Sequence, residues 1–261
     1  MTSQGPTSTS TPHLYRMLHH STTPSTSPHP AVIVMLTKTH DSSREKCYPY
    51  YPRTAADSPV LIQKTSEFGD DLTGAVHLVS SSYDSTARTT VRELRLEIEE
   101  DGKKQEKKIW HLLFEGWPDF GVPDGADKVA LLKLIDLSAR LNTAGPESPR
   151  VVHCSAGVGR TGTFIALDYL FSELDEGALD EMRSSPRGKS GGGEGRRKSG
   201  GTSFEGDPVA GTVDRLRKQR MMMVQGESQF HFLYELLRER WLERAGRGRE
   251  AKELREDMVQ R

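Results

Sequence analysis

The stretch that decides the fold reads HCSAGVGRTG and occupies residues 153–162. Val151 and Val152 precede it and open a short strand. Apolar residues at helical spacing over residues 161–174 predict a helix after it. Residues 153–160 therefore form the connection between a strand and a helix.

This connection has the composition of an anion-binding loop. Cys154 and Arg160 are separated by five residues, two of which are glycines. In such a turn the backbone N–H groups point inward, and the helix N-terminus adds a partial positive charge. The same field favours the thiolate of Cys154, and the planar fork of Arg160 can bind two phosphoryl oxygens. A lone cysteine near a tight turn is more often a core residue, but here a nucleophile and an anion clamp share one turn.

The segments around this loop predict a sheet covered by helices. Residues 31–36 are a continuous apolar run, typical of a strand that is buried on both faces. Alternation over residues 94–98, a turn at residues 101–102 and a strand at residues 109–114 predict an antiparallel pair. Helical patterns cover residues 127–141, 213–220 and 227–244. The predicted fold class is α/β, of the α+β type, with a twisted mixed β-sheet flanked by helices.

Composition excludes several classes of protein. The 261 residues include 36 Lys and Arg against 37 Asp and Glu, so bulk charge attracts neither nucleic acid nor an anionic membrane. Two cysteines cannot build a disulfide framework, the N-terminus lacks the features of a signal peptide, and no apolar run is long enough to span a bilayer. We expect a reducing setting, cytoplasmic or nuclear. The nine histidines show no metal-ligand spacing, so neither a metal nor a cofactor is expected. The oligomeric state stays open.

Residues 153–161 resemble the His-Cys-x5-Arg-Ser/Thr signature of the tyrosine-specific protein phosphatases. The sequence WPDFG at residues 117–121 resembles the mobile acid loop of that family, and QGESQ at residues 225–229 resembles its glutamine loop. The resemblance implies a protein tyrosine phosphatase-like fold and two-step covalent catalysis without a metal. Arsenate-reductase-like and rhodanese-like chemistry would not explain the two flanking motifs.

The resemblance also implies a role for individual residues. Cys154 would be the nucleophile, Asp119 the general acid and later the general base, and Gln225 would position the attacking water. Thr161 would stabilise the leaving thiolate. The residues implied in substrate binding are Ser155, Ala156, Gly157, Val158, Gly159, Arg160 and Gln229.

Three further residues are expected to support the site. His153 would orient the cysteine loop, and Trp117 belongs to the acid loop. Asp41 stands where the family tends to carry a glutamate facing the active site. A carboxylate at this position could reach toward Arg160 or Lys46, but from a shorter side chain.

The resemblance runs from about residue 2 to about residue 243 and begins part-way through the family's domain. Residues 1–30 are a Ser/Thr/Pro-rich start that contains the Gln-Gly-Pro motif and one or two helical turns near residues 14–18. Residues 31–243 are expected to form a partial catalytic domain, interrupted by a flexible insertion at residues 183–206. Residues 244–261 form a charged tail. Because the N-terminal elements of the family are missing, we expect exposed sheet edges and a pocket without one aromatic wall.

Three functions are compatible with these features. The first is a protein-tyrosine phosphatase in signal transduction, which hydrolyses phosphotyrosine in partner proteins through a cysteinyl-phosphate, either as the chain stands or together with upstream residues that this sequence has lost. The second is a non-catalytic phosphotyrosine-binding scaffold or a truncated inactive fragment. The third is a dual-specificity Cys-based phosphatase, which the missing aromatic wall leaves open.

Overall fold

The computed structural model describes residues 1–21, 29–41, 43–63, 72–100, 102–119, 121–145, 148–179 and 206–246. The chain divides into two compact units, Met1–Gly162 and Thr163–Arg261. The predicted insertion at residues 183–206 and the predicted tail at residues 244–261 lie outside the described residues, apart from residue 206 and residues 244–246.

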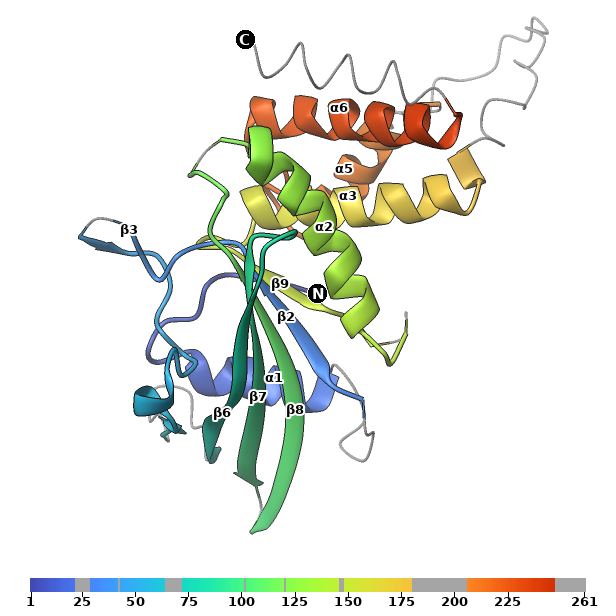
Figure 1. Cartoon of the computed structure of the whole chain (residues 1–261). Helices are drawn as coiled ribbons and strands as arrows, with labels where there is room; N and C mark the ends of the chain where they lie inside the picture. The colour runs from blue at the N-terminus through green and yellow to red at the C-terminus, as the bar shows by residue number, and fades with distance from the viewer. Residues whose placement is uncertain are drawn as a thin grey trace, which may run out of the picture. The chain divides into compact units, whose positions relative to one another are not determined.

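The first unit contains a seven-stranded mixed sheet in the order β1-β9-β2-β8-β7-β6-β5 (Figure 1). Its strands are β1 (Thr2–Ser3), β2 (Ala31–Met35), β5 (Val60–Ile62), β6 (Thr73–Asp84), β7 (Thr89–Glu100), β8 (Lys103–Phe114) and β9 (Val151–His153). The neighbouring strands among β1, β9, β2 and β8 pair in parallel. The neighbouring strands among β8, β7, β6 and β5 pair antiparallel. The predicted mixed sheet is confirmed. Two short strands, β3 (His40–Asp41) and β4 (Arg44–Glu45), form a separate ladder, and a 3-10 turn, η1, covers Ala55–Asp57.

Helices cover both faces of the central strand β2, all five residues of which are buried. On one face Ile33 and Met35 share a hydrophobic cluster with Leu14 and Leu18 of α1 (Thr11–Ser21). Since successive side chains of a strand point to opposite faces, Val32 and Val34 face the other side, where α2 (Gly125–Leu141) contacts β2 and β8. The prediction of one or two helical turns at residues 14–18 was too short. The helix extends over 11 residues because its apolar side chains pack on the sheet, despite the Ser/Thr/Pro-rich surroundings.

The hairpin of β7 and β8 confirms the predicted antiparallel pair, with strands of 12 residues each. Strand β6 was not predicted, although it is as long as its neighbours. Most of its side chains are half-buried or exposed, and a bulge shifts its register between Leu78 and Ser80, so the sequence shows no sustained alternation.

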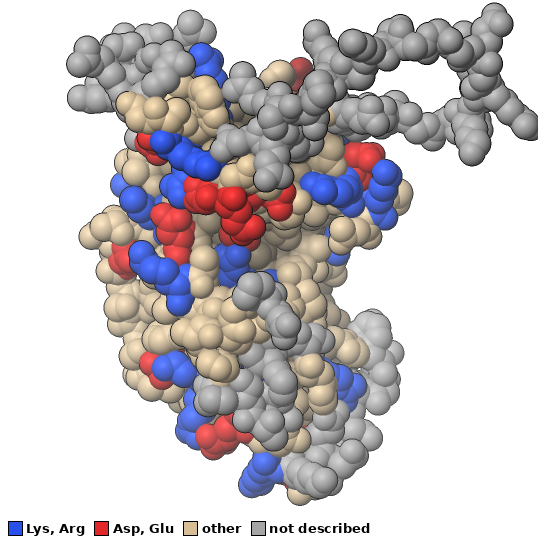
Figure 2. All heavy atoms as spheres, turned by 90° about the vertical axis from the view of Figure 1, so that its right-hand side faces the viewer, with Lys and Arg blue, Asp and Glu red and all other residues tan. Residues whose placement is uncertain are grey.

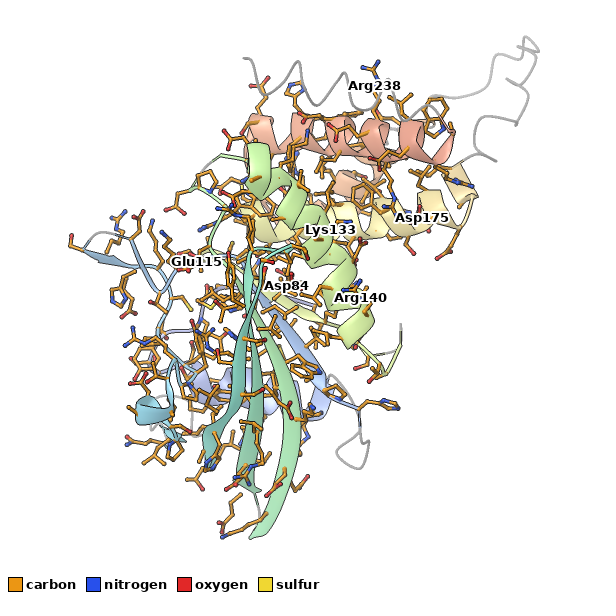
Figure 3. The ribbon with its side chains drawn as sticks, viewed as in Figure 1. Asp84, Glu115, Lys133, Arg140, Asp175 and Arg238 are labelled. Carbon is orange, nitrogen blue, oxygen red and sulfur yellow. The ribbon has the colours of Figure 1, made fainter. Side chains whose placement is uncertain are left out.

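The second unit is helical. It contains most of α3 (Gly159–Asp175), together with α5 (Pro208–Gln219) and α6 (Glu227–Arg244). Asp207 caps α5 by accepting a hydrogen bond from the Ala210 N–H (2.9 Å), and it also accepts one from the Tyr234 hydroxyl of α6 (2.7 Å). Arg240 of α6 pairs with Asp175 (2.6 Å), which Figure 3 labels at the end of α3. These contacts join the three helices.

The charge is balanced locally as well as in total. On the face that Figure 2 shows, basic and acidic side chains lie interspersed. Within the described parts of the chain, no helix is both long and apolar enough to cross a membrane.

Candidate active site

The candidate site lies at the carboxyl ends of three parallel strands of the first unit. Strands β2, β8 and β9 end at Met35, Phe114 and His153, and each is followed by a loop that carries polar residues. Glu115, directly after β8, lies at the same end of the sheet as Asp84, the last residue of β6 (Figure 3). Ligands of open α/β sheets bind at this end of the strands.

The cysteine loop follows β9 and leads into α3. Cys154 is 3% exposed, and its Sγ accepts a hydrogen bond from the Gly157 N–H at 3.2 Å. Gly157 has φ +71°, a conformation that L side chains rarely adopt. The loop therefore directs a backbone donor at the sulfur, as an anion cradle requires.

A network of hydrogen-bonded, buried polar side chains supports the cysteine loop. The Nδ1–H of His153 donates to the carbonyl of Cys154 (3.1 Å), so its Nε2 is free to accept from the Tyr50 hydroxyl (2.8 Å). His111 in turn donates from Nε2 to the same hydroxyl (3.1 Å). Burial lowers the pKa of His153 to about 4 and the pKa of His111 well below its usual range, so both rings are neutral. Sequence reasoning missed Tyr50 and His111, which lie far from residue 153 in the chain.

Arg160 joins the cysteine loop to the predicted acid loop. Its side chain is 9% exposed, donates to the Trp117 carbonyl (3.3 Å), and forms an ion pair with Asp119 (2.7 Å). The indole N–H of Trp117 donates to the Gly121 carbonyl at 3.0 Å, which closes the acid loop on itself. The sequence motifs at residues 117–119 and 153–160 are thus in direct contact.

The carboxylate of Asp119 lies between two cations. It accepts a hydrogen bond from Lys46 as well as pairing with Arg160. The hydrogen bond from Lys46 is the largest cause of a lowered pKa at Asp119, partial burial opposes it, and the charge of Arg160 adds to it. In this state Asp119 is ionised.

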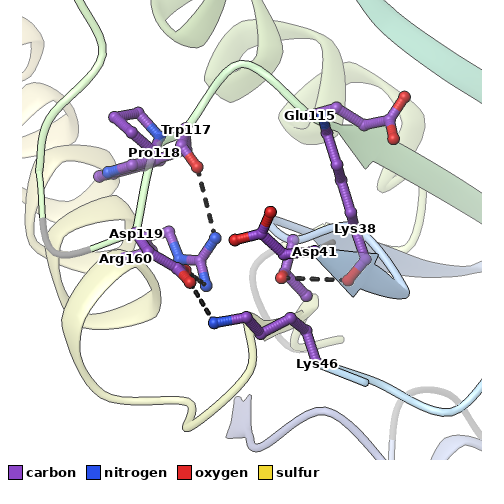
Figure 4. Close-up of a pocket in the computed structure, with 9 residues that line it drawn as sticks. Lys38, Asp41, Lys46, Glu115, Trp117, Pro118, Asp119 and Arg160 are labelled. Carbon is purple, nitrogen blue, oxygen red and sulfur yellow. Dashed lines mark hydrogen bonds and ion pairs between the residues drawn. The ribbon is translucent and has the colours of Figure 1, made fainter. Parts of the chain in front are cut away.

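These residues line a cavity of about 230 Å³, which Figure 4 shows in close-up. Its lining consists of Thr37, Lys38, Asp41, Lys46, Glu115, Trp117, Pro118, Asp119 and Arg160. Asp41 is one of the lining residues. The ion pairs described for Arg160 and Lys46 join these two cations to Asp119. Sequence reasoning missed Lys38 and Glu115. Their positions shortly after two buried parallel strands were the signal that could have found them.

The remaining predicted residues of the first unit lie in or next to the loop. Thr161 is fully buried, and its Oγ1 has no hydrogen-bond partner among the described residues. The other predicted phosphate-binding positions of the turn are Ser155, Ala156, Val158 and Gly159, of which Ala156 is exposed. Among the described residues, no group of three or more His, Cys, Asp or Glu side chains could hold a metal ion.

The two predicted glutamines belong to the second unit, at the start of α6. Gln225 is exposed in the loop that joins α5 to α6. Gln229 is 3% exposed, and its Oε1 accepts a hydrogen bond from the Gly226 N–H (3.2 Å). On the other side of Gln225, Arg217 donates to the carbonyls of Met223 (3.0 Å) and Val224 (2.8 Å). The backbone on both sides of Gln225 is therefore held in place.

Comparison with known proteins gives consistent results. Tyrosine-protein phosphatase 1 of Saccharomyces cerevisiae is 33% identical over 246 residues, which cover 88% of this chain and 66% of that protein. Tyrosine-protein phosphatase 3 of Schizosaccharomyces pombe is 38% identical over 176 residues, or 66% of this chain and 51% of that protein. The mouse tyrosine-protein phosphatase non-receptor type 9 is 30% identical, and the match covers 82% of this chain and 31% of the relative. The chain thus spans two thirds or less of the length of these relatives.

Solved structures share the fold. The Trypanosoma cruzi protein tyrosine phosphatase TcPTP1 superimposes with a TM-score of 0.64 at 23% identity, over 93% of this chain and 67% of that one. PTPN18 in complex with HER2 phosphopeptides gives a TM-score of 0.64 at 22% identity, over 92% of this chain and 65% of that one. A family model described as protein-tyrosine phosphatase matches residues 1–186. Together with the contact between the cysteine loop and the acid loop, this match shows that the chain belongs to the protein-tyrosine phosphatase family.

Proposed function

We propose that the chain hydrolyses phosphotyrosine in proteins through a cysteinyl-phosphate intermediate. One observation carries the proposal: Arg160, from the turn that holds Cys154, contacts the carboxylate of Asp119 at 2.7 Å. Nucleophile, anion clamp and acid therefore belong to one site within the first unit.

In the first step, the Cys154 thiolate attacks phosphorus and forms an S–P bond. The inward-facing loop amides and Arg160 hold the equatorial oxygens. The P–O bond to tyrosine breaks, and the departing oxygen takes the proton of Asp119. Because the bound phosphoryl group competes with Asp119 for Arg160 and brings negative charge close to the carboxylate, substrate binding raises the pKa of Asp119 and allows the acid to be protonated.

In the second step, a water placed by Gln225 attacks phosphorus. Asp119 accepts the proton of the water, the S–P bond breaks, and the electron pair returns to Cys154 as a thiolate. The buried hydroxyl of Thr161, which has no hydrogen-bond partner in the described part of the chain, is available to stabilise that thiolate. Gln229 supports Gln225 indirectly, because its side chain accepts a hydrogen bond from the backbone N–H of Gly226, the residue that follows Gln225.

We infer that the partners are phosphotyrosine-bearing proteins and that the setting is cytoplasmic, in signal transduction. One observation and one chemical requirement support a reducing setting. Both cysteines, Cys47 and Cys154, are free, and a thiolate nucleophile requires reducing surroundings.

The proposal is tested with a phosphotyrosyl peptide and a phosphoseryl peptide of the same sequence. We expect phosphate release from the first alone, and loss of release in Cys154→Ser but not in the matched control Cys47→Ser. Asp119→Ala should slow release while the peptide still binds, since the acid is lost and the cradle remains. Equal release from both peptides would indicate the dual-specificity alternative, and undiminished release by Cys154→Ser would overturn the proposal.

A further inference from the structure

The N-terminal segment of the chain is attached to the outer side of the cysteine loop. Strand β1 pairs in parallel with β9, with Thr2 opposite Val152. Beyond this ladder, the Thr2 hydroxyl donates to the Gly157 carbonyl (3.0 Å), and the Gly5 N–H donates to the Ser155 carbonyl (2.8 Å). Two carbonyls of the loop are therefore held away from its anion-binding side.

These contacts determine where the loop amides point. In a planar trans peptide the C=O and the N–H of one unit point in opposite directions. A carbonyl held outward at Gly157 therefore turns the N–H of Val158 inward, and the bond to Ser155 does the same for Ala156. The Gly157 N–H, which lies between them, donates to the sulfur of Cys154.

Gly157 is the position at which this orientation is easiest to lose. Glycine has no Cβ, so the peptide on either side of it can rotate at little steric cost. Its approach to β1 is too close for any other residue, because a Cβ would lie 2.2 Å from the Ser3 carbonyl oxygen. The site needs a glycine there, and the contact from Thr2 removes the freedom that the glycine introduces.

We infer that Thr2 is a positioning residue for oxyanion binding: its hydroxyl holds the Gly157–Val158 peptide in the orientation that presents an amide to the phosphoryl group. The inference rests on the proposed function, since it concerns the same loop. Thr2 is not among the residues that line the cavity, and its hydroxyl acts on the loop through the Gly157 carbonyl.

The test compares Thr2→Val, which keeps the shape and the strand preference but lacks the hydroxyl, with Thr2→Ser, which restores the hydroxyl. Ser3→Ala is the matched control, because the Ser3 hydroxyl lies in the same strand but donates to the neighbouring Gln4 carbonyl (2.8 Å) instead of to the cysteine loop. Binding of inorganic tungstate, a tetrahedral oxyanion, is measured by calorimetry on the full chain, alongside the thermal unfolding midpoint.

We expect tungstate to bind about fivefold more weakly to Thr2→Val, the effect of about one hydrogen bond, with binding restored in Thr2→Ser and unchanged in Ser3→Ala. We also expect Thr2→Val to raise the KM for an aryl phosphate, including under conditions in which the unfolding midpoint shows that the variant is folded. Wild-type tungstate affinity in a folded Thr2→Val, or an equal loss in Thr2→Ser, would overturn the role of Thr2 and leave the proposed function intact. A wild-type chain that binds no tungstate would overturn the proposed function itself.

Discussion

Replacement of Gly157 by alanine is the most informative perturbation of the cysteine loop. An added Cβ would lie 2.2 Å from the Ser3 carbonyl oxygen and 2.7 Å from the Gln4 nitrogen, both of which are backbone atoms. Ordinary contact begins at 3.4 Å, so the loop and β1 must separate by about 1.2 Å. The positive φ of +71° adds about 1–2 kcal/mol of backbone strain for an L residue.

The displacement and the strain have different consequences. A misplacement of about 1 Å at a reacting centre can lower the rate about 100-fold, so we expect kcat/KM for an aryl phosphate to fall by about that factor. The strain alone lowers only the unfolding midpoint. Gly102→Ala separates the two effects, because Gly102 has φ +72° and its added Cβ would meet nothing within 4 Å.

The assay measures kcat/KM, the inhibition constant of tungstate and the thermal unfolding midpoint for both variants. We expect both midpoints to fall by a few degrees, and only Gly157→Ala to lose activity and tungstate affinity. If Gly157→Ala kept wild-type kcat/KM while its midpoint fell as in Gly102→Ala, the reasoning that β1 fixes the loop geometry would be refuted.

Three other predictions concern the charged and buried groups around the loop. Lys46 and Arg160 hold the pKa of Asp119 below its usual range, so its ion pairs contribute stability that is fully present above the ordinary carboxyl pKa and is lost as the pH falls through the lowered pKa. The free energy of unfolding, measured in urea at pH 7 and at acid pH, should therefore decrease less in Asp119→Asn than in wild type. Identical decreases in the two proteins would contradict this. Tyr50→Phe leaves buried imidazole nitrogens unpaired and should cost about 1–3 kcal/mol of unfolding free energy in urea, whereas the exposed Tyr83→Phe should cost nothing measurable. Arg160→Lys loses the planar fork and should lower kcat/KM about 100-fold, a loss that near-normal turnover would exclude.

The sequence alone predicted the parts of the fold in which local pattern and burial agree. The apolar run of β2, the junction from β9 to α3 and the hairpin of β7 and β8 all have strong local signals. Strand β6 was missed because most of its side chains are half-buried or exposed. Helix α1 was predicted too short because its stability comes from packing on the sheet, which composition does not show.

The same distinction applies to the site. Cys154, Arg160 and Asp119 could be selected because each belongs to a short motif with a chemical reason for its spacing. Tyr50 and His111 could not, because Tyr50 meets His153 across 103 residues and His111 meets Tyr50 across 61 residues, in both cases only through tertiary contacts. The hydrogen bond from Thr2 to Gly157 likewise joins residues that are 155 positions apart, and no local pattern indicates it.

The central claim is that Cys154 carries the phosphoryl group between the two steps. Intact-protein and peptide mass spectrometry on the chain, quenched in acid during turnover of a phosphotyrosyl peptide, tests it most directly. We predict one added phosphoryl group, located on the peptide that contains Cys154, and more of it in Gln225→Ala, where water attack is slowed. Turnover without any such adduct in either protein, or an adduct on another residue, would contradict the account.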